Sequence, residues 1–203
     1  VKRTAKLYAF NMFLLYPFSH CIAAKGDIGA SVDLSLDGIP TSYQFFLQMV
    51  FCMLTEDFLF HCSHRMLHRP SIYPYIHKIH HEHKVTISVA AQYAHPIEFI
   101  FGNCLPTAMG PMILGKKMHL TAIFAWYAIR NIESVEGHSG YEFPWSPFRI
   151  IPFGVDEAYH AYHHSQNVGN YSSFFTLWDT IWGSNKQYYK YLETKDKEHA
   201  KKE

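Results

Sequence analysis

The sequence has few cysteines, and none of them stands in a metal-binding spacing. Its 203 residues include four, scattered among apolar neighbours: Cys21, Cys52, Cys62 and Cys104. The absence of any Cys-x-x-Cys argues against a thiolate zinc finger and against an iron–sulfur cluster. The irregular spacing also favours reduced thiols over a disulfide framework.

Charge of one sign is not in excess, and nucleotide-binding motifs are missing. The 18 Lys and Arg against 17 Asp and Glu give a net charge of +1 at pH 7. This balance gives no electrostatic case for nucleic acid as a partner. The sequence contains no Gly-x-Gly-x-x-Gly, no phosphate loop and no Ser-His-Asp arrangement. Electrons for redox chemistry would therefore have to come from another protein.

Long hydrophobic runs are also absent, because no run reaches the about 20 residues that cross a bilayer unaided. Four shorter runs occur instead, at residues 7–24, 43–55, 99–114 and 120–129. We expect them to pair as two membrane-embedded helical hairpins. Residues 25–42 would connect the first pair, and a turn from Gly110-Pro111 to Lys117 the second. A soluble all-helical protein with buried helices is the alternative.

The basic residues orient these hairpins. Most lie on the side to which both hairpins return, whereas residues 25–42 carry one Lys against three Asp. The positive-inside rule places the first side in the cytosol. Lys116-Lys117 at the second turn are the exception, and a re-entrant hairpin with its tip in the membrane interface would accommodate them.

The length suits one domain. We expect residues 1–192 to form a single membrane-embedded domain and residues 193–203 a charged tail, either a solvated helix end or disordered. The sequence begins at Val1 without a signal-peptide pattern, so we expect an N-terminal portion to be missing. The predicted fold class is all-α: membrane-embedded helical hairpins with a histidine-rich, metal-binding helical cap in the cytosol.

Histidine is the residue that the sequence has in abundance. Eight of its 15 histidines form three tight groups: His64-x-x-x-His68, His77-x-x-His80-His81 and His160-x-x-His163-His164. Residues three or four apart share a helix face, so each group directs two or three imidazoles at one point. Imidazole suits iron, zinc, copper and nickel. Because zinc takes four ligands and a facial-triad iron three, eight histidines predict two metals.

The first group continues a longer stripe on one helix face. Asp57, His61, His64 and His68 follow one another at steps of four, three and four residues as the chain leaves an apolar run. Pro70 ends that helix, because proline disfavours helical geometry in the residue before it. His61 lies on the ligand face but outside the recurring pattern, so it is either a ligand or a residue that supports one.

Single histidines mark the two ends of the second hairpin. His138 and His95 lie beside the membrane boundary on the side of the three groups, which makes both additional candidate ligands, His138 ahead of His95. His83 faces away from His77 and His80 and is assigned to the surface. Seven carboxylates are candidates to hold the outer nitrogen of a ligand histidine: Asp57, Glu82, Glu98, Glu133, Glu136, Asp156 and Glu157.

The order of the three groups resembles the fatty acid hydroxylase/sterol desaturase superfamily of integral membrane di-iron enzymes. Longer strings, within residues 56–189, are similar to its C-4 methylsterol oxidase branch. They are HRMLHR at 64–69, YIHKIHHE at 75–82, YAHPIE at 93–98, HSGY at 138–141, FPWSP at 143–147 and GNYSS at 169–173, with WD at 178–179 and WG at 182–183. Residues 84–92 depart from the branch, since they lack its Pro-Phe-Gly and carry Gln92 where it has Glu.

The resemblance implies a metal centre and a reaction. Two iron ions, for which zinc can substitute on purification, would bind His64, His68, His77, His80, His81, His138, His160, His163 and His164, with His61 and His95 as further candidates. O2 would be the co-substrate in oxidising the C-4 methyl group of sterol precursors. Electrons would come from NAD(P)H through cytochrome b5 and its reductase.

The resemblance also implies a location. The chain would be a multi-pass protein of the endoplasmic reticulum membrane, with its active site facing the cytosol, and would work beside other enzymes of sterol C-4 demethylation. Two alternatives stay open. One is another superfamily member, such as a sterol desaturase or a fatty acyl or sterol hydroxylase; the other is a non-catalytic membrane protein that keeps its metals for structure.

Overall fold

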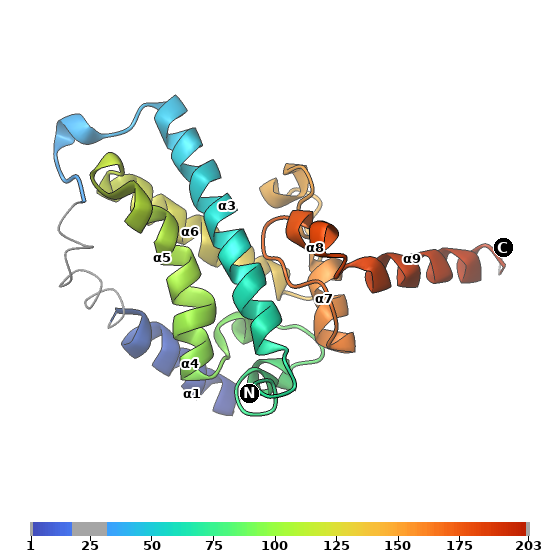
Figure 1. The fold of residues 1–203 in the computed structure, drawn as a ribbon. Coiled ribbons are helices and arrows are strands. Elements are labelled where there is room, and N and C mark those ends of the chain that lie inside the picture. The colour runs from blue at the N-terminus through green and yellow to red at the C-terminus, as the bar shows by residue number, and fades with distance from the viewer. Residues whose placement is uncertain (1, 18–31, 202–203) are drawn as a thin grey trace.

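The fold is all-helical in the part of the chain that the structure describes. The computed structural model describes residues 2–17 and 32–201. Over these residues, helices are joined by short loops, with two isolated β-bridges and no strand (Figure 1). The predicted all-α class is therefore confirmed.

The longest helix, α3 (Ser42–Leu67), joins the second apolar run to the first histidine group. It begins at a capping box, in which Thr41 Oγ1 accepts from the Gln44 N–H and the Gln44 side chain accepts from the Thr41 N–H. Its C-cap is His68, two residues before Pro70, as predicted. One continuous helix therefore carries both the apolar segment and the first histidines.

The third and fourth apolar runs lie on helices that meet at a tight turn. Three consecutive pieces form the first helix: α4 (Pro96–Glu98), the π-helical η5 (Phe99–Cys104) and α5 (Leu105–Leu114). The 3-10 turn η6 (Gly115–Lys117) leads to α6 (Leu120–Gly137), which contacts both α5 and α3.

The predicted start of this turn is wrong, because α5 continues through Gly110-Pro111 and the turn occupies only η6, at the end of the predicted range. Pro111 has no N–H to bond the Thr107 carbonyl, but that carbonyl accepts from Trp126 Nε1 on α6 at 2.8 Å. Gly110 lies where α5 crosses α3, and a Cβ there would lie 2.9 Å from the Cα of Cys52. The Trp126 indole thus satisfies the carbonyl that Pro111 leaves without a donor, and glycine at position 110 lets α5 pack closely against α3.

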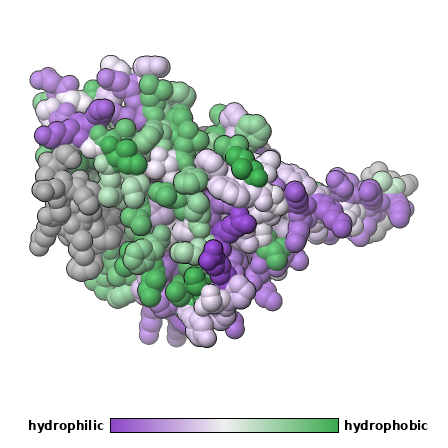
Figure 2. Space-filling view, viewed as in Figure 1, coloured by the Kyte–Doolittle hydropathy of each residue, from purple (hydrophilic) through white to green (hydrophobic). Residues whose placement is uncertain are grey.

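Within the part of the chain that the structure describes, two helical segments are long and apolar enough to cross a membrane. They are Ser42–Leu67 and Pro96–Lys117, each with a mean hydropathy of 1.3. Large apolar side chains such as Phe46, Leu54 and Phe101 are exposed on them, and hydrophobic surface covers much of this face of the molecule (Figure 2). Length and composition alone therefore admit a membrane position for both.

The N-terminal helix α1 (Lys2–Phe10) continues into the π-helical turn η1 (Asn11–Leu15) and packs near the loop that precedes α4. Asn11 Nδ2 donates to the carbonyls of Gln92 and Ala94, both at 2.9 Å. Residues 18–24 of the first apolar run, and residues 25–31 of its predicted connecting loop, lie outside the described residues. The first hairpin therefore stays a prediction.

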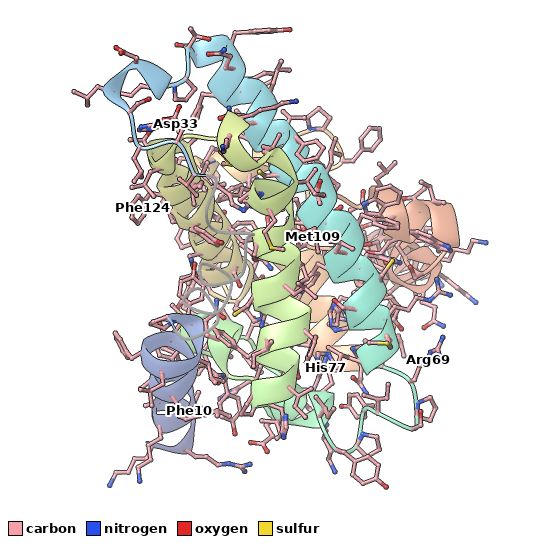
Figure 3. All side chains as sticks on the ribbon, turned by 60° about the vertical axis from the view of Figure 1, so that its left-hand side comes forward. Phe10, Asp33, Arg69, His77, Met109 and Phe124 are labelled. Carbon is pink, nitrogen blue, oxygen red and sulfur yellow. The ribbon has the colours of Figure 1, made fainter. Side chains whose placement is uncertain are left out.

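Short helices and loops form a cap at one end of the long helices. His77 and Arg69 lie at that end, and Asp33 lies at the opposite end (Figure 3). The predicted charged tail is exposed through residue 201, and its helix projects away from the body (Figure 1). The remaining elements are η2 (Leu36–Gly38), η3 (His77–Glu82), η4 (Ser88–Gln92), η7 (Pro147–Ile150), α7 (Glu157–Gln166), α8 (Leu177–Trp182) and α9 (Lys186–His199).

Candidate metal centre

Nine histidines from distant parts of the sequence gather into two adjacent groups in the cap. Within each group, one nitrogen of every ring lies within 4.8 Å of the others. All are buried except the half-buried His68. The five-histidine group is His64, His68, His77, His81 and His163, and the four-histidine group is His80, His138, His160 and His164. These are the nine residues that the sequence analysis predicts as ligands.

The helices divide neighbouring histidines between the two groups. On α3, His64 and His68 are about one turn apart and share a group. On α7, His160 and His164 have the same spacing and share the other group. His163 lies beside His164 in the sequence but points about 100° away around the helix, so it joins the five-histidine group.

The second histidine motif lies on a 3-10 helix, η3. His77 and His81 contribute to the five-histidine group, while His80 contributes to the four-histidine group. The rings of His80 and His81 stand at 89° to each other, so consecutive residues serve different groups. His138, the C-cap of α6, completes the four-histidine group.

The inward nitrogens of the five-histidine group are Nε2 atoms in close contact. His77 Nε2 lies 3.1 Å from His64 Nε2 and 3.0 Å from His81 Nε2. His68 Nε2 lies 3.2 Å from His163 Nε2. Rings from three separate elements therefore converge through the same atom type.

The four-histidine group has the same arrangement. His160 Nε2 lies 3.0 Å from His138 Nε2 and 3.1 Å from His164 Nε2. His138 Nε2 lies 3.4 Å from His80 Nε2. The two groups thus differ in the number of histidines, but in both groups the inward nitrogens are Nε2 atoms.

In five of the nine histidines the outer nitrogen, Nδ1, faces a backbone carbonyl. A carbonyl only accepts, so each such Nδ1 carries the proton and its Nε2 presents a lone pair inward. Lone pairs this close repel one another unless a cation lies among them, so the donor set fits one metal ion in each group. The contacts are His64 to Tyr171 at 2.9 Å, His163 to Gly169 at 2.6 Å, His80 to Tyr93 at 3.2 Å, His138 to Ser134 at 2.8 Å and His164 to His83 at 3.0 Å.

One carboxylate supports a ring of the five-histidine group. His77 Nδ1 donates to Glu98 Oε1 at 2.7 Å, and both side chains are buried. A carboxylate in this position fixes the orientation of the ring and raises its basicity as a ligand. Glu98 is therefore the one of the seven candidate carboxylates that takes the predicted role in the described structure.

The other candidate carboxylates bind elsewhere. Asp57 Oδ1 accepts from three consecutive backbone N–H groups, starting at Ser173 2.9 Å away. Glu133 binds Arg130 at 2.6 Å, and Asp156 caps α7. The further contacts are Glu82 with Tyr93 at 2.6 Å and Glu157 with Thr86 at 2.8 Å, while Glu136 lines the cavity described below.

Burial keeps the imidazoles neutral. It lowers the pKa of His80 to about 4 and the pKa values of His68 and His138 to about 3, because a buried site disfavours the charged ring. The pKa of His163 is also well below its usual range, for the same reason. Neutral imidazole is the form that binds a metal, so the groups are ready to bind one at neutral pH.

A cavity of about 890 Å³, its open mouth included, adjoins both groups. Histidines of both groups line it: His64, His77, His80, His138 and His160. Apolar side chains form other parts of the wall, among them Phe60, Leu67, Phe143 and Phe148.

Two further candidate ligands lie outside both groups. His61 Nδ1 lies 3.3 Å from Ser172 Oγ and 3.4 Å from Asp179 Oδ1, away from the nine rings. His95 Nδ1 caps α4 by accepting from the Ile97 N–H. His61 shares a helix face with His64, but its ring contacts Asp179 and Ser172 instead of joining the group.

The assignment of His83 to the surface is incomplete. Its ring is half-buried and lies 3.1 Å from Thr4 Oγ1 on α1, and its carbonyl accepts from His164 Nδ1. Sequence reasoning also missed the carbonyls of Gly169 and Tyr171. No side-chain pattern signals such acceptors, because they belong to the backbone of an irregular loop.

Comparisons with known proteins agree with the site. A sequence model of the fatty acid hydroxylase family matches residues 49–184. A Dictyostelium discoideum protein named "Putative methylsterol monooxygenase" is 38% identical over 187 residues, 92% of this chain and 66% of that protein. "Very-long-chain aldehyde decarbonylase GL1-8" of Oryza sativa subsp. japonica is 38% identical over 157 residues, 76% of this chain and 58% of that protein. "Methylsterol monooxygenase 1" of Rattus norvegicus is 37% identical over 165 residues, 81% and 55% of the two chains.

The chain spans about 55–66% of the length of these curated relatives. No solved structure matches it. The stretch that matches the family contains all nine histidines of the two groups. The resemblance predicted from the three histidine motifs is confirmed, and the chain belongs to the fatty acid hydroxylase family.

Proposed function

We propose that the chain is the catalytic part of a di-iron monooxygenase that oxidises the C-4 methyl group of sterol precursors. The observation that carries this proposal is the pair of adjacent all-histidine groups on the wall of one cavity. Aromatic and apolar side chains in the wall of the cavity suit an apolar ligand. The names of the Dictyostelium and rat relatives support a methylsterol as the substrate class.

Each histidine group would hold one iron ion, and zinc could take its place on purification. When bound, the two ions would activate O2 for the oxidation of an unreactive methyl group. The chain's own contribution is to keep the rings neutral and directed inward, through burial, backbone acceptors and Glu98. Apolar residues of the cavity, such as Phe60 and Phe148, would hold the substrate and exclude water.

The membrane would supply the substrate. In this proposal Ser42–Leu67 and Pro96–Lys117 belong to two hairpins that enter the endoplasmic reticulum membrane, and the cap with both histidine groups faces the cytosol. α3 supports this arrangement, because its apolar part runs directly into His64 at the cavity. A sterol could then reach the metal layer without leaving an apolar environment.

The electrons would come from NAD(P)H through cytochrome b5 and its reductase. The lack of a nucleotide-binding motif in the sequence supports an external donor. Other enzymes of sterol C-4 demethylation would remove the oxidised carbon, so the proposal also implies that they act beside this chain.

Sterol profiling of cells that lack the protein tests the substrate. Accumulation of 4-methylated sterols, reversed by the wild-type gene, would support the proposal. Normal C-4 demethylation, with a missing ring double bond or missing hydroxy acids, would favour a sterol desaturase or a fatty acyl hydroxylase instead. The rice relative makes a long-chain aldehyde a second candidate substrate, so loss of aldehyde consumption with normal sterols would favour that reaction.

A non-catalytic role is tested on the purified full chain. Two irons per chain, with O2 consumption that depends on a sterol and a reductant, fit the enzyme. Zinc binding alone does not decide, because zinc can displace iron during expression. Iron-loaded protein that consumes no O2 with a sterol, a fatty acyl lipid or a long-chain aldehyde would contradict the proposal.

A further inference from the structure

The loop between α7 and α8, residues 167–176, supports the five-histidine group. The Tyr171 carbonyl accepts from His64 Nδ1, and the Gly169 carbonyl accepts from His163 Nδ1. The carbonyls that accept from the four-histidine group belong to other segments: Tyr93, Ser134 and His83. The backbone acceptors of the two groups therefore belong to different parts of the chain.

Asp179, on α8, holds this loop in place. Its carboxylate is fully buried. Oδ1 accepts from the Tyr171 N–H at 3.0 Å and the Ser184 hydroxyl at 2.5 Å, and Oδ2 accepts from the Ser172 N–H and the Tyr159 hydroxyl, both at 2.9 Å. An ionised carboxylate only accepts, so it satisfies four donors that an amide cannot satisfy together.

The backbone of the loop is left-handed at two consecutive residues, Gly169 with φ of 60° and Asn170 with φ of 53°. Asn170 Nδ2 donates to the Tyr159 carbonyl at 2.9 Å, which anchors the loop to α7. A Cβ on Gly169 would clash with the Ser184 carbonyl oxygen. The position of the Gly169 carbonyl, and with it the ring of His163, therefore requires glycine here.

We propose that Asp179 is a positioning residue of the metal centre. It orients His64 and His163 through the loop and so sets the metal affinity of the five-histidine group, while the four-histidine group keeps its own support. The inference rests on the proposed function for the presence of metal. It follows that substitution of a residue that binds no metal should lower the metal affinity of one group without changing that of the other.

The test is the iron content of Asp179→Asn. The full chain is purified in detergent, loaded with ferrous iron without O2, and dialysed against a weak chelator before elemental analysis. The amide directs an NH2 group at two of the four donors, so the loop should shift. Supporting contacts of this kind typically change metal affinity about 10–100-fold. We expect iron to fall from two per chain to one.

A second variant and a matched control use the glycines. Gly169→Ala should also lower iron from two to one, because it moves the same carbonyl. Gly137→Ala lies beside His138 in the four-histidine group, but a Cβ there has nothing within 4 Å. This control should keep two irons. If Asp179→Asn does not fold, Gly169→Ala carries the test alone.

Double variants identify which iron is lost. Asp179→Asn combined with His160→Ala should retain no iron, because both groups are then weakened. Asp179→Asn combined with His68→Ala should retain one, because both changes fall on the five-histidine group. This pattern is independent of turnover.

The proposal is overturned if Asp179→Asn and Gly169→Ala both keep two irons at wild-type affinity. It is also overturned if both lose two irons, since the loop would then serve the whole centre. Wild-type protein that holds two irons but oxidises no sterol would refute the proposed function and leave this inference standing, provided that the variants separate the groups.

Discussion

The five-histidine and four-histidine groups use the same ring nitrogens but are supported by different regions of the molecule. The first depends on Glu98 and the loop after α7, and the second on carbonyls of Tyr93, Ser134 and His83. The four-histidine group has one protein donor fewer, so its metal would keep more positions for other ligands. The comparison predicts that the metal affinities of the two groups are set separately, because their supporting contacts come from different segments.

Removing a ligand from either group should have the largest effect. We expect His163→Ala and His80→Ala each to lose the metal of its own group and to abolish oxidation, because both ions would be needed for the chemistry. Iron content and substrate-dependent O2 consumption measure this. His83→Ala is the matched control, since its backbone carbonyl still accepts from His164, and it should keep both irons. Full activity of His80→Ala or His163→Ala would refute the assignment.

His138 tests whether the four-histidine group needs all its members. Its Nε2 contacts both His80 and His160, so His138→Ala should lose the metal of this group as completely as His80→Ala does. His95→Ala should have little effect on metal content, because that ring caps α4. A His138→Ala protein with two irons would show that three rings suffice.

Substitution of Glu98 tests whether a contact that supports one ring affects the metal affinity of its own group alone. Glu98→Ala removes the acceptor of His77 Nδ1. We expect the metal affinity of the five-histidine group to fall about 10–100-fold, with the other group unchanged. Competition with a chelator of known affinity measures both sites. Glu82→Ala is the control, because that carboxylate binds Tyr93 and Arg3 instead. Equal weakening of both groups would contradict separate support.

The smallest effect is expected at the contact between η1 and the segment that supports His80. Asn11 binds the carbonyls of Gln92 and Ala94, which flank the Tyr93 carbonyl that accepts from His80. Asn11→Ala leaves buried carbonyls without their donor, which destabilises the fold by about 1–3 kcal/mol. Thermal unfolding should detect this, with at most a slight loss of metal from the four-histidine group. Selective loss of metal from the five-histidine group would contradict the separate support of the two groups.

Spacing along the helices predicted most of the centre. Because side chains three and four apart share a helix face, His64 with His68 and His160 with His164 were identifiable from their spacing. His138 was predicted from its place at the end of a long helix. His61 shows the limit of this reasoning, since it has the right spacing but binds Asp179 instead.

The fold was predicted less completely where distant residues decide local structure. Gly110-Pro111 indicated a turn, but helix α5 passes through it because the Trp126 indole, on another helix, bonds the carbonyl that Pro111 leaves free. Local sequence signals report only the preferences of the nearby backbone. A donor from a separate element can outweigh them.

The sequence by itself determined the all-α class, the family and the nine clustered histidines, because periodicity and ligand type are local properties of the chain. Only the tertiary structure decided how the nine rings divide into five and four, which carboxylate supports His77, and which loop supports His64 and His163. The division depends on where helices from distant parts of the chain meet. The supporting contacts depend on backbone carbonyls, which every residue possesses and which only folding brings into position.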